Sequence, residues 1–149
     1  MRDIIVGIVT AFLGTLGCAV VFRSKKQHIP VISLGGALSW AVYLASAVFF
    51  TSEPLCYFIA SSAVGIYSEI FARVLKTPTT NIFAVAVLPL IPGGALYYTM
   101  RYAVNGHWSE FLIHGNRTLG IAVAIALGIL TVSTAVRLFA VIRKKAKTI

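Results

Sequence analysis

Residues 81–100 read NIFAVAVLPLIPGGALYYTM, an apolar stretch that is long enough to cross a membrane. Pro89 and Pro92 stand near its middle, and a proline both lacks the backbone N–H and clashes with the carbonyl group four residues earlier. Gly93 and Gly94 follow directly and add backbone freedom. The stretch therefore predicts a membrane helix that is broken near its centre.

A helix broken inside a bilayer exposes polar backbone groups, which is tolerated only where the break is buried in protein or lines a watery cavity. Many secondary transporters build a substrate site from such a break. A new helix starting at Pro92 would direct free N–H groups and a positive dipole end toward a carboxylate or another anion. Two interpretations stay open, a substrate or gating site and a simple proline kink in a packed bundle. For the first, the candidate residues are Pro89, Pro92, Gly93, Gly94, Tyr97 and Tyr98.

The two tyrosines of this group have an alternative of their own. Tyr97 and Tyr98 lie one turn beyond the break, where their hydroxyl groups could donate to a substrate. They could equally belong to an aromatic belt at the membrane–water interface.

The composition of the chain predicts an all-α polytopic membrane protein. Of its 149 residues 58% are hydrophobic and 11% are charged, with a mean hydropathy of +0.90. We expect one transmembrane domain over 1–149. Segments of roughly twenty apolar residues cross a bilayer core of about 30 Å. Five such segments occur, at about 4–22, 30–50, 55–75, 81–103 and 118–142. The longest connection is expected at 104–117.

The basic residues lie unevenly about these segments. Ten of the 13 Lys and Arg residues fall on the side of the C-terminus, and only Arg2, Arg101 and Arg117 fall on the other. The positive-inside rule then predicts five crossings, with the N-terminus outside and the C-terminus in the cytoplasm. Four crossings with a re-entrant fourth segment would leave the basic C-terminus outside. Membrane topology thus accounts for the net charge of +9, and no nucleic-acid-binding motif accompanies it.

Glu69 is the only carboxylate inside a predicted span. Arg73 follows four residues later, at the spacing of an ion pair on a helix. Ionisable groups within membranes are costly and often mark ion pathways. Glu69 is therefore either a proton-coupling or gating group, or one half of a structural pair with Arg73.

Small residues recur at helical spacing in the other spans, a pattern that lets helix backbones pack closely in lipid. We expect these stripes to form seams between helices. The residues of these stripes are Gly7, Ala11 and Gly14, then Gly36, Ser39, Tyr43 and Ser46, then Ser61, Gly65, Ser68 and Ala72, and finally Gly120, Ala124 and Gly128.

Residues that could support enzymatic or metal chemistry are few. His107, Glu110 and His114 would share one helix face, but this part of the connection is more typical of a short interfacial helix than of a metal site. Cys18 and Cys56 lie in apolar segments without metal or disulfide spacing. Neither a nucleotide-binding loop nor a catalytic-triad pattern occurs. We expect no enzyme, no metal and no cofactor.

Several of these features occur together in one known family. The residues EIFARVLK at 69–76, Pro78 and PLIPGGALYYTM at 89–100 resemble the small membrane component of the threonine/serine exporter family. The resemblance covers nearly the whole chain and is strongest from about 60 to 130. Ala95 stands where a third small residue, often glycine, is expected, and this departure bears on substrate identity.

The resemblance implies a two-component transporter. Its larger multi-span partner subunit carries a cytosolic region and a Pro-Gly break of its own, so that the two halves form inverted repeats. It also implies export of threonine and serine, or of dicarboxylates such as succinate in some members. We therefore expect a subunit of a proton-driven secondary exporter in the bacterial inner membrane. The alternatives are a dicarboxylate exporter subunit and a non-transporting assembly subunit.

Overall fold

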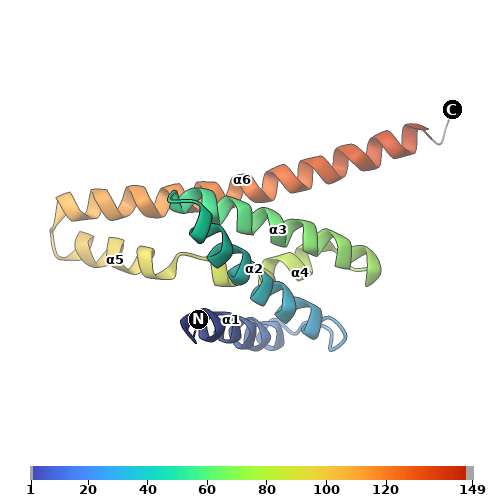
Figure 1. Ribbon diagram of the computed structural model, residues 1–149, viewed down its shortest axis with the longest axis horizontal. Coiled ribbons are helices and arrows are strands. Elements are labelled where there is room, and N and C mark those ends of the chain that lie inside the picture. Colours follow the sequence, from blue (N-terminus) through green and yellow to red (C-terminus); the bar gives the residue numbers. More distant parts are fainter. Residues whose placement is uncertain (1, 147–149) are drawn as a thin grey trace.

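The computed structural model describes residues 2–146, and every regular element in this range is a helix. Met1 and 147–149, which the expected domain includes, lie outside the described residues. The elements in chain order are α1 (Arg2–Val21), α2 (Ile29–Phe49), α3 (Glu53–Val74), α4 (Thr79–Ala86), the 3-10 turn η1 (Leu88–Leu90), α5 (Gly93–Val104) and α6 (Trp108–Ala146). Contacts join α1 to α2, α2 to α3 and α3 to α6, while the short α4 packs against α2 and α3 (Figure 1).

Local sequence sets the helix ends. Pro30 and Pro54 stand in the first turns of α2 and α3, where a missing N–H leaves no hydrogen bond unmade. α1 and α3 are followed by Arg23 and Lys76, which adopt positive φ angles of 52° and 50°. In both turns the next amide donates to the carbonyl group five residues earlier, at 3.0 Å, which closes the helix end.

The predicted stripes of small residues lie at seams between helices. A Cβ atom on Gly36 would collide with the side chain of Thr15 on α1, and one on Gly128 would collide with Ser61 on α3. Gly14 is an exception, because nothing lies within 4 Å of the Cβ position there. Close backbone approach therefore holds α1 to α2 and α3 to α6.

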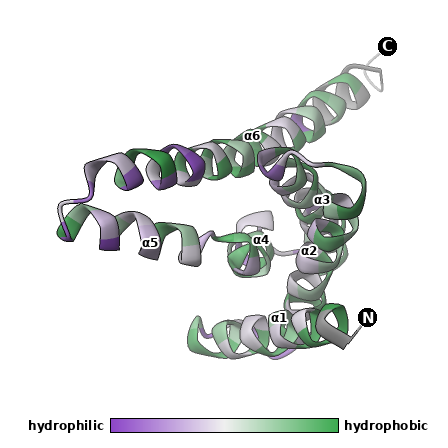
Figure 2. Cartoon of the chain, turned by 60° about the vertical axis from the view of Figure 1, so that its left-hand side comes forward, coloured by the Kyte–Doolittle hydropathy of each residue, from purple (hydrophilic) through white to green (hydrophobic). Residues whose placement is uncertain are grey.

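The last helix is much longer than the predicted span. α6 has 39 residues and begins at Trp108, so the expected connection over 104–117 shrinks to 105–107. Residues 108–146 contain no proline, and α5 packs along the first part of α6 to form a helical hairpin. This hairpin extends beyond the rest of the bundle and carries more hydrophilic residues than the bundle does (Figure 2). At about 1.5 Å per residue α6 is roughly 58 Å long, well beyond a bilayer core.

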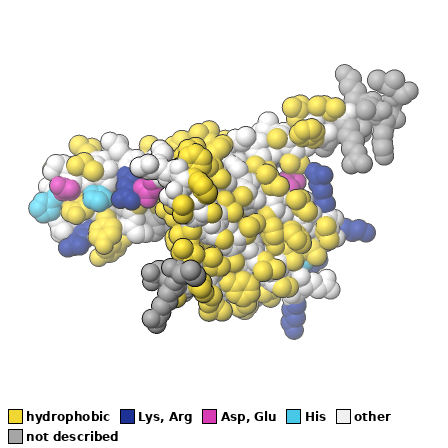
Figure 3. All heavy atoms as spheres, viewed as in Figure 1, with side chains coloured by type: hydrophobic (Ala, Val, Ile, Leu, Met, Phe, Trp, Pro, Cys, Tyr) yellow, Lys and Arg dark blue, Asp and Glu magenta, His cyan; other side chains and the backbone are white. Residues whose placement is uncertain are grey.

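The surface agrees with a membrane protein. α1, α2, α3 and α6 are each long and apolar enough to cross a bilayer, and the bent pair Thr79–Leu90 with Gly93–Val104 makes a fifth crossing if it is one span. The two halves of this pair meet at 60°. Hydrophobic side chains cover the middle of the molecule, and charged residues gather toward its ends (Figure 3). The prediction of an all-α polytopic membrane protein is confirmed.

Candidate functional site

The helix break lies where the sequence predicts it. Hydrogen bonds of the α-helical type end at the amide of Val87, and the amides of Leu90 and Ile91 reach back only three residues. The α-helical pattern resumes at Leu96, whose amide donates to the carbonyl of Pro92 at 3.0 Å. Pro92 caps α5, and Gly93 is its first residue, one position later than predicted.

A cavity of about 480 Å³ lies beside this break. It is lined by the break, α2, the first turns of α3, and the α5–α6 hairpin. Five of the six residues singled out from the sequence line it, namely Pro89, Pro92, Gly93, Gly94 and Tyr98. A Cβ atom on either glycine would meet nothing within 4 Å, so the two glycines leave the space open.

Tyr97 is the sixth residue, and it does not reach the cavity. Its side chain is 63% exposed and lies with Met100 and Arg101 around a separate shallow depression. Successive residues of a helix point about 100° apart, and here Tyr98 faces the cavity while Tyr97 faces away from it.

An ion pair in the cavity wall was missed by sequence reasoning. Arg117 of α6 donates from Nε and Nη2 to the two carboxylate oxygens of Glu53 on α3, at 2.6 and 2.9 Å. Such a bidentate pair is charge-assisted and geometrically specific. The two side chains are 57% and 29% exposed, respectively, so a small charged molecule can reach the pair. Glu53 lies just before the predicted span 55–75 and Arg117 just before 118–142, on the same predicted side of the membrane. This shared side is the only sequence signal of the pair, and it does not specify the contact.

Backbone donors lie on the same cavity. The amides of Gly94 and Ala95 precede the first α-helical hydrogen bond of α5, and both residues belong to the lining. The first N–H groups of a helix have no partner within the helix and carry its positive dipole end. This arrangement favours a carboxylate beside the break.

Aromatic side chains complete the lining. Tyr98 and Tyr102 of α5 lie near His114 of α6, and the ring centroids of Tyr102 and His114 are 4.9 Å apart in a stacked arrangement. Trp40 and Tyr57 line the cavity from α2 and α3. The cavity therefore combines two opposite charges, free amides, and phenol and indole groups that can donate hydrogen bonds.

Glu69 lies on a different cavity. It is four to five helical turns from Glu53 along α3, roughly 24 Å at 1.5 Å per residue. Its cavity, of about 340 Å³, is also lined by Thr79, Ser133 and Arg137. Arg73 Nη2 is 3.8 Å from the Glu69 carboxylate, and the side chains are 65% and 23% exposed, respectively. The sequence spacing therefore does bring Glu69 and Arg73 together, but loosely.

The histidine-containing group is arranged differently from the prediction. His107 precedes α6, so it does not share a helix face with Glu110 and His114. Among the described residues no three His, Cys, Asp or Glu side chains are placed to hold a metal ion.

Comparison with known proteins identifies the family. A family model described as "Threonine/Serine exporter, ThrE" matches residues 7–135. No curated protein and no solved structure matches the chain. The matched range contains the whole helix break, the Glu53–Arg117 pair and Glu69, in agreement with the resemblance seen in the sequence. Because the match covers most of its length, the chain belongs to the threonine/serine exporter family.

Proposed function

We propose that this chain is the membrane subunit of a secondary exporter for a small zwitterionic amino acid, threonine or serine, and that the cavity beside the helix break holds the substrate. The observation that carries this proposal is the Glu53–Arg117 pair in the wall of that cavity. The volume of about 480 Å³ falls within the range of roughly 300–1,000 Å³ that is typical of small-molecule sites.

A zwitterion matches both charges of the cavity. The guanidinium of Arg117 can receive the substrate carboxylate in a bidentate arrangement, and Glu53 can accept hydrogen bonds from the ammonium group. The amides of Gly94 and Ala95 add donors for the carboxylate. The substrate then replaces an ion pair of the protein with two new ones, so that no charge in the cavity is left without a partner.

A dicarboxylate such as succinate matches this cavity less well. One of its carboxylates can bind Arg117, but Glu53 then presents a like charge to the molecule, which disfavours it. The charge pattern therefore supports the amino acid over the dicarboxylate. A non-transporting assembly subunit would have no use for an open, charged cavity at a broken helix.

We propose further that the proton gradient drives export and that Glu69 is the coupling group. Glu69 is partly buried, lines a cavity of its own and has only a distant partner in Arg73. The substrate cavity and Glu69 lie at opposite ends of α3. Coupling of proton transfer to substrate export would therefore require α3 to move against α4 and α6 between two states.

In the proposed orientation the N-terminus is outside and the C-terminus is cytoplasmic, in a bacterial inner membrane. The substrate cavity then lies toward the outer side, and a larger multi-span partner subunit completes the transporter. We therefore expect activity from a reporter that works only in the cytoplasm when it is fused after Ile149. An external reporter would contradict both the orientation and the fifth crossing.

The direct test of the substrate site is the double variant Gly93→Leu with Gly94→Leu. Leucine side chains would fill the cavity and keep the segment apolar, so we expect loss of labelled threonine efflux with normal membrane insertion. Gly17→Leu is the matched control, because the Cβ position there also meets nothing within 4 Å but Gly17 lines none of the cavities described above. Efflux should be measured in cells that also contain the partner subunit, with succinate as the competing substrate.

Normal threonine efflux in the double variant would reduce the break to a kink. A second readout is independent of transport rate. Cysteine introduced at position 93 or 94, after replacement of Cys18 and Cys56, should react with small water-soluble thiol reagents, and threonine should slow that reaction. Protection by succinate but not by threonine would instead support the dicarboxylate alternative.

A further inference from the structure

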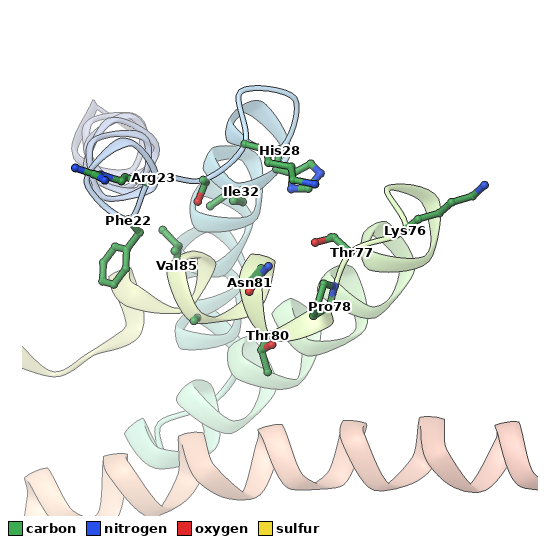
Figure 4. Close-up of a pocket in the computed structure, with 13 residues that line it drawn as sticks. Phe22, Arg23, His28, Ile32, Lys76, Thr77, Pro78, Thr80, Asn81 and Val85 are labelled. Carbon is green, nitrogen blue, oxygen red and sulfur yellow. The ribbon is translucent and has the colours of Figure 1, made fainter.

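A second cavity, of about 450 Å³, lies between the α1–α2 turn and the α3–α4 turn, away from the helix break (Figure 4). Its lining includes the basic residues Arg23, Lys25 and Lys76 together with His28, and it includes no carboxylate. The two salt bridges among the described residues use other cations, Arg73 and Arg117. The rim of the cavity is therefore basic.

Two helix N-termini add to this positive field. His28 caps α2 and Pro78 caps α4, and neither helix start has a side-chain capping hydrogen bond. By contrast, the ends of α1 and α3 at the same place are closed by hydrogen bonds of their own turns. The first N–H groups of α2 and α4 are therefore directed toward this end of the bundle, and free N–H groups at a helix start favour anions.

His28 is an independent indication of a ligand. The residue is only 6% exposed, yet its imidazole makes no capping bond and takes no part in the side-chain hydrogen bonds found among the described residues. In Figure 4 the ring points away from its own helix toward the space near Thr77 and Asn81. The ring nitrogens are not among the fully buried side-chain atoms that lack a partner, so they reach the open space of the cavity, where a ligand can bond to them.

We propose that this cavity binds the phosphate of an anionic phospholipid headgroup. The cavity lies at the end of the apolar spans, where headgroups of a bilayer are found, and basic pockets between membrane helices at this level suit lipid phosphates. Phe22, 66% exposed, forms part of the rim, and Val21 beside it is 79% exposed. These side chains offer acyl chains an apolar path out of the cavity, which a free phosphate ion would not need.

The cations are placed to adapt to such a ligand. Figure 4 shows Arg23 and Lys76 on opposite sides of the cavity, with their charged ends directed outward and Asn81 between them. Long flexible side chains can swing toward a phosphate, while the amide of Asn81 is already in place on α4.

Lipid binding to the purified full-length chain in neutral detergent tests the proposal. We expect phosphatidylglycerol to be retained in native mass spectrometry and to raise the melting temperature, and phosphatidylcholine to do neither. Inorganic phosphate should raise the melting temperature less than the lipid does. An equal effect of phosphatidylcholine would overturn the site, and an equal effect of inorganic phosphate would overturn its assignment to a lipid.

Variants locate the binding in this cavity. Asn81→Asp adds a negative charge there without changing the Lys and Arg residues that set topology, and it should weaken phosphatidylglycerol binding about fivefold. Asn105→Asp, in the α5–α6 turn, adds the same charge elsewhere and should leave binding unchanged. Lys76→Gln should weaken binding by a similar factor, whereas Lys26→Gln, next to Lys25 but outside the lining, should not.

Wild-type binding by a folded Asn81→Asp variant would overturn the proposal. Because all of these readouts measure lipid binding and not transport, they are independent of the exporter function proposed above.

Discussion

The two carboxylates of α3 are held in very different ways. Glu53 receives two hydrogen bonds from Arg117 of the neighbouring helix α6, at 2.6 and 2.9 Å. Glu69 lies 3.8 Å from Arg73, on the same helix, and that partner is mostly exposed. The first pair ties two helices together beside the break, whereas the second leaves its carboxylate loosely partnered. One residue type on one helix is thus held tightly in one place and loosely in another, and the position of its arginine partner makes the difference.

The largest effect is expected for Arg117→Gln. A hydrogen bond to a charged group contributes about 1.5–3 kcal/mol, and each 1.4 kcal/mol is a factor of ten, so threonine efflux should fall at least about tenfold. Arg117→Lys keeps the charge but loses the planar guanidinium, so its threonine efflux should lie between that of wild type and that of Arg117→Gln. Efflux is measured in cells, with the membrane level of each variant as the control.

The fold should survive this change. The pair is partly exposed, so its contribution to stability is about 1 kcal/mol or less. Wild-type efflux in Arg117→Gln would show that the ion pair does not bind the substrate. The proposed difference in role between Glu53 and Glu69 would then be contradicted.

The next effect concerns Glu69 and is selective. Glu69→Gln cannot release or take up a proton, so gradient-driven export should be lost while exchange of threonine across the membrane without a gradient persists. The measurement compares both modes in proteoliposomes. Equal loss of both modes would show that Glu69 acts on the fold or on the substrate, and not on coupling.

These two pairs also show what the sequence could and could not predict. The helix break was predictable because Pro89, Pro92 and the two glycines act on their own backbone. The contact between Glu69 and Arg73 was predictable because a helix places residues four apart on one face. The Glu53–Arg117 pair depends on two helices meeting 64 residues apart in the chain, and no local pattern contains that information.

The start of α6 was missed for a related reason. The polar residues of 104–117 are typical of a connection, but packing of α5 against α6 in the hairpin stabilises the helical conformation of most of them. Tertiary contacts often override local preference in this way. Tyr98 and Tyr102 of α5 and His114 and Arg117 of α6 form one wall of the cavity beside the break, so its outline depends on that hairpin and could not be predicted from the chain alone.

A smaller effect is expected along the seam that connects the two carboxylates. Gly128→Ala would collide with the side chain of Ser61 and place a Cβ 2.9 Å from the carbonyl oxygen of Phe58, which is backbone and cannot turn away. Overpacking of this kind costs about 1–3 kcal/mol, measurable as a lower unfolding midpoint of the purified chain. Gly17→Ala, in open space, is the control and should not destabilise. Unchanged stability in Gly128→Ala would show that α3 and α6 are not tightly held between the two pairs.

The smallest effect is expected for Arg73→Gln. Exposed ion pairs at this helical spacing contribute only about 0.3–0.5 kcal/mol, and a separation of 3.8 Å between an exposed guanidinium and its partner is at the weak end. Stability and gradient-driven export should both stay close to wild type, and the double variant Glu69→Gln with Arg73→Gln should behave like Glu69→Gln alone.

A different outcome would contradict the role proposed for Glu69. If Arg73→Gln loses as much export as Glu69→Gln, and the double variant recovers it, the two residues interact as a structural pair. Glu69 would then resemble Glu53 in being a held charge, and the coupling group would have to lie elsewhere.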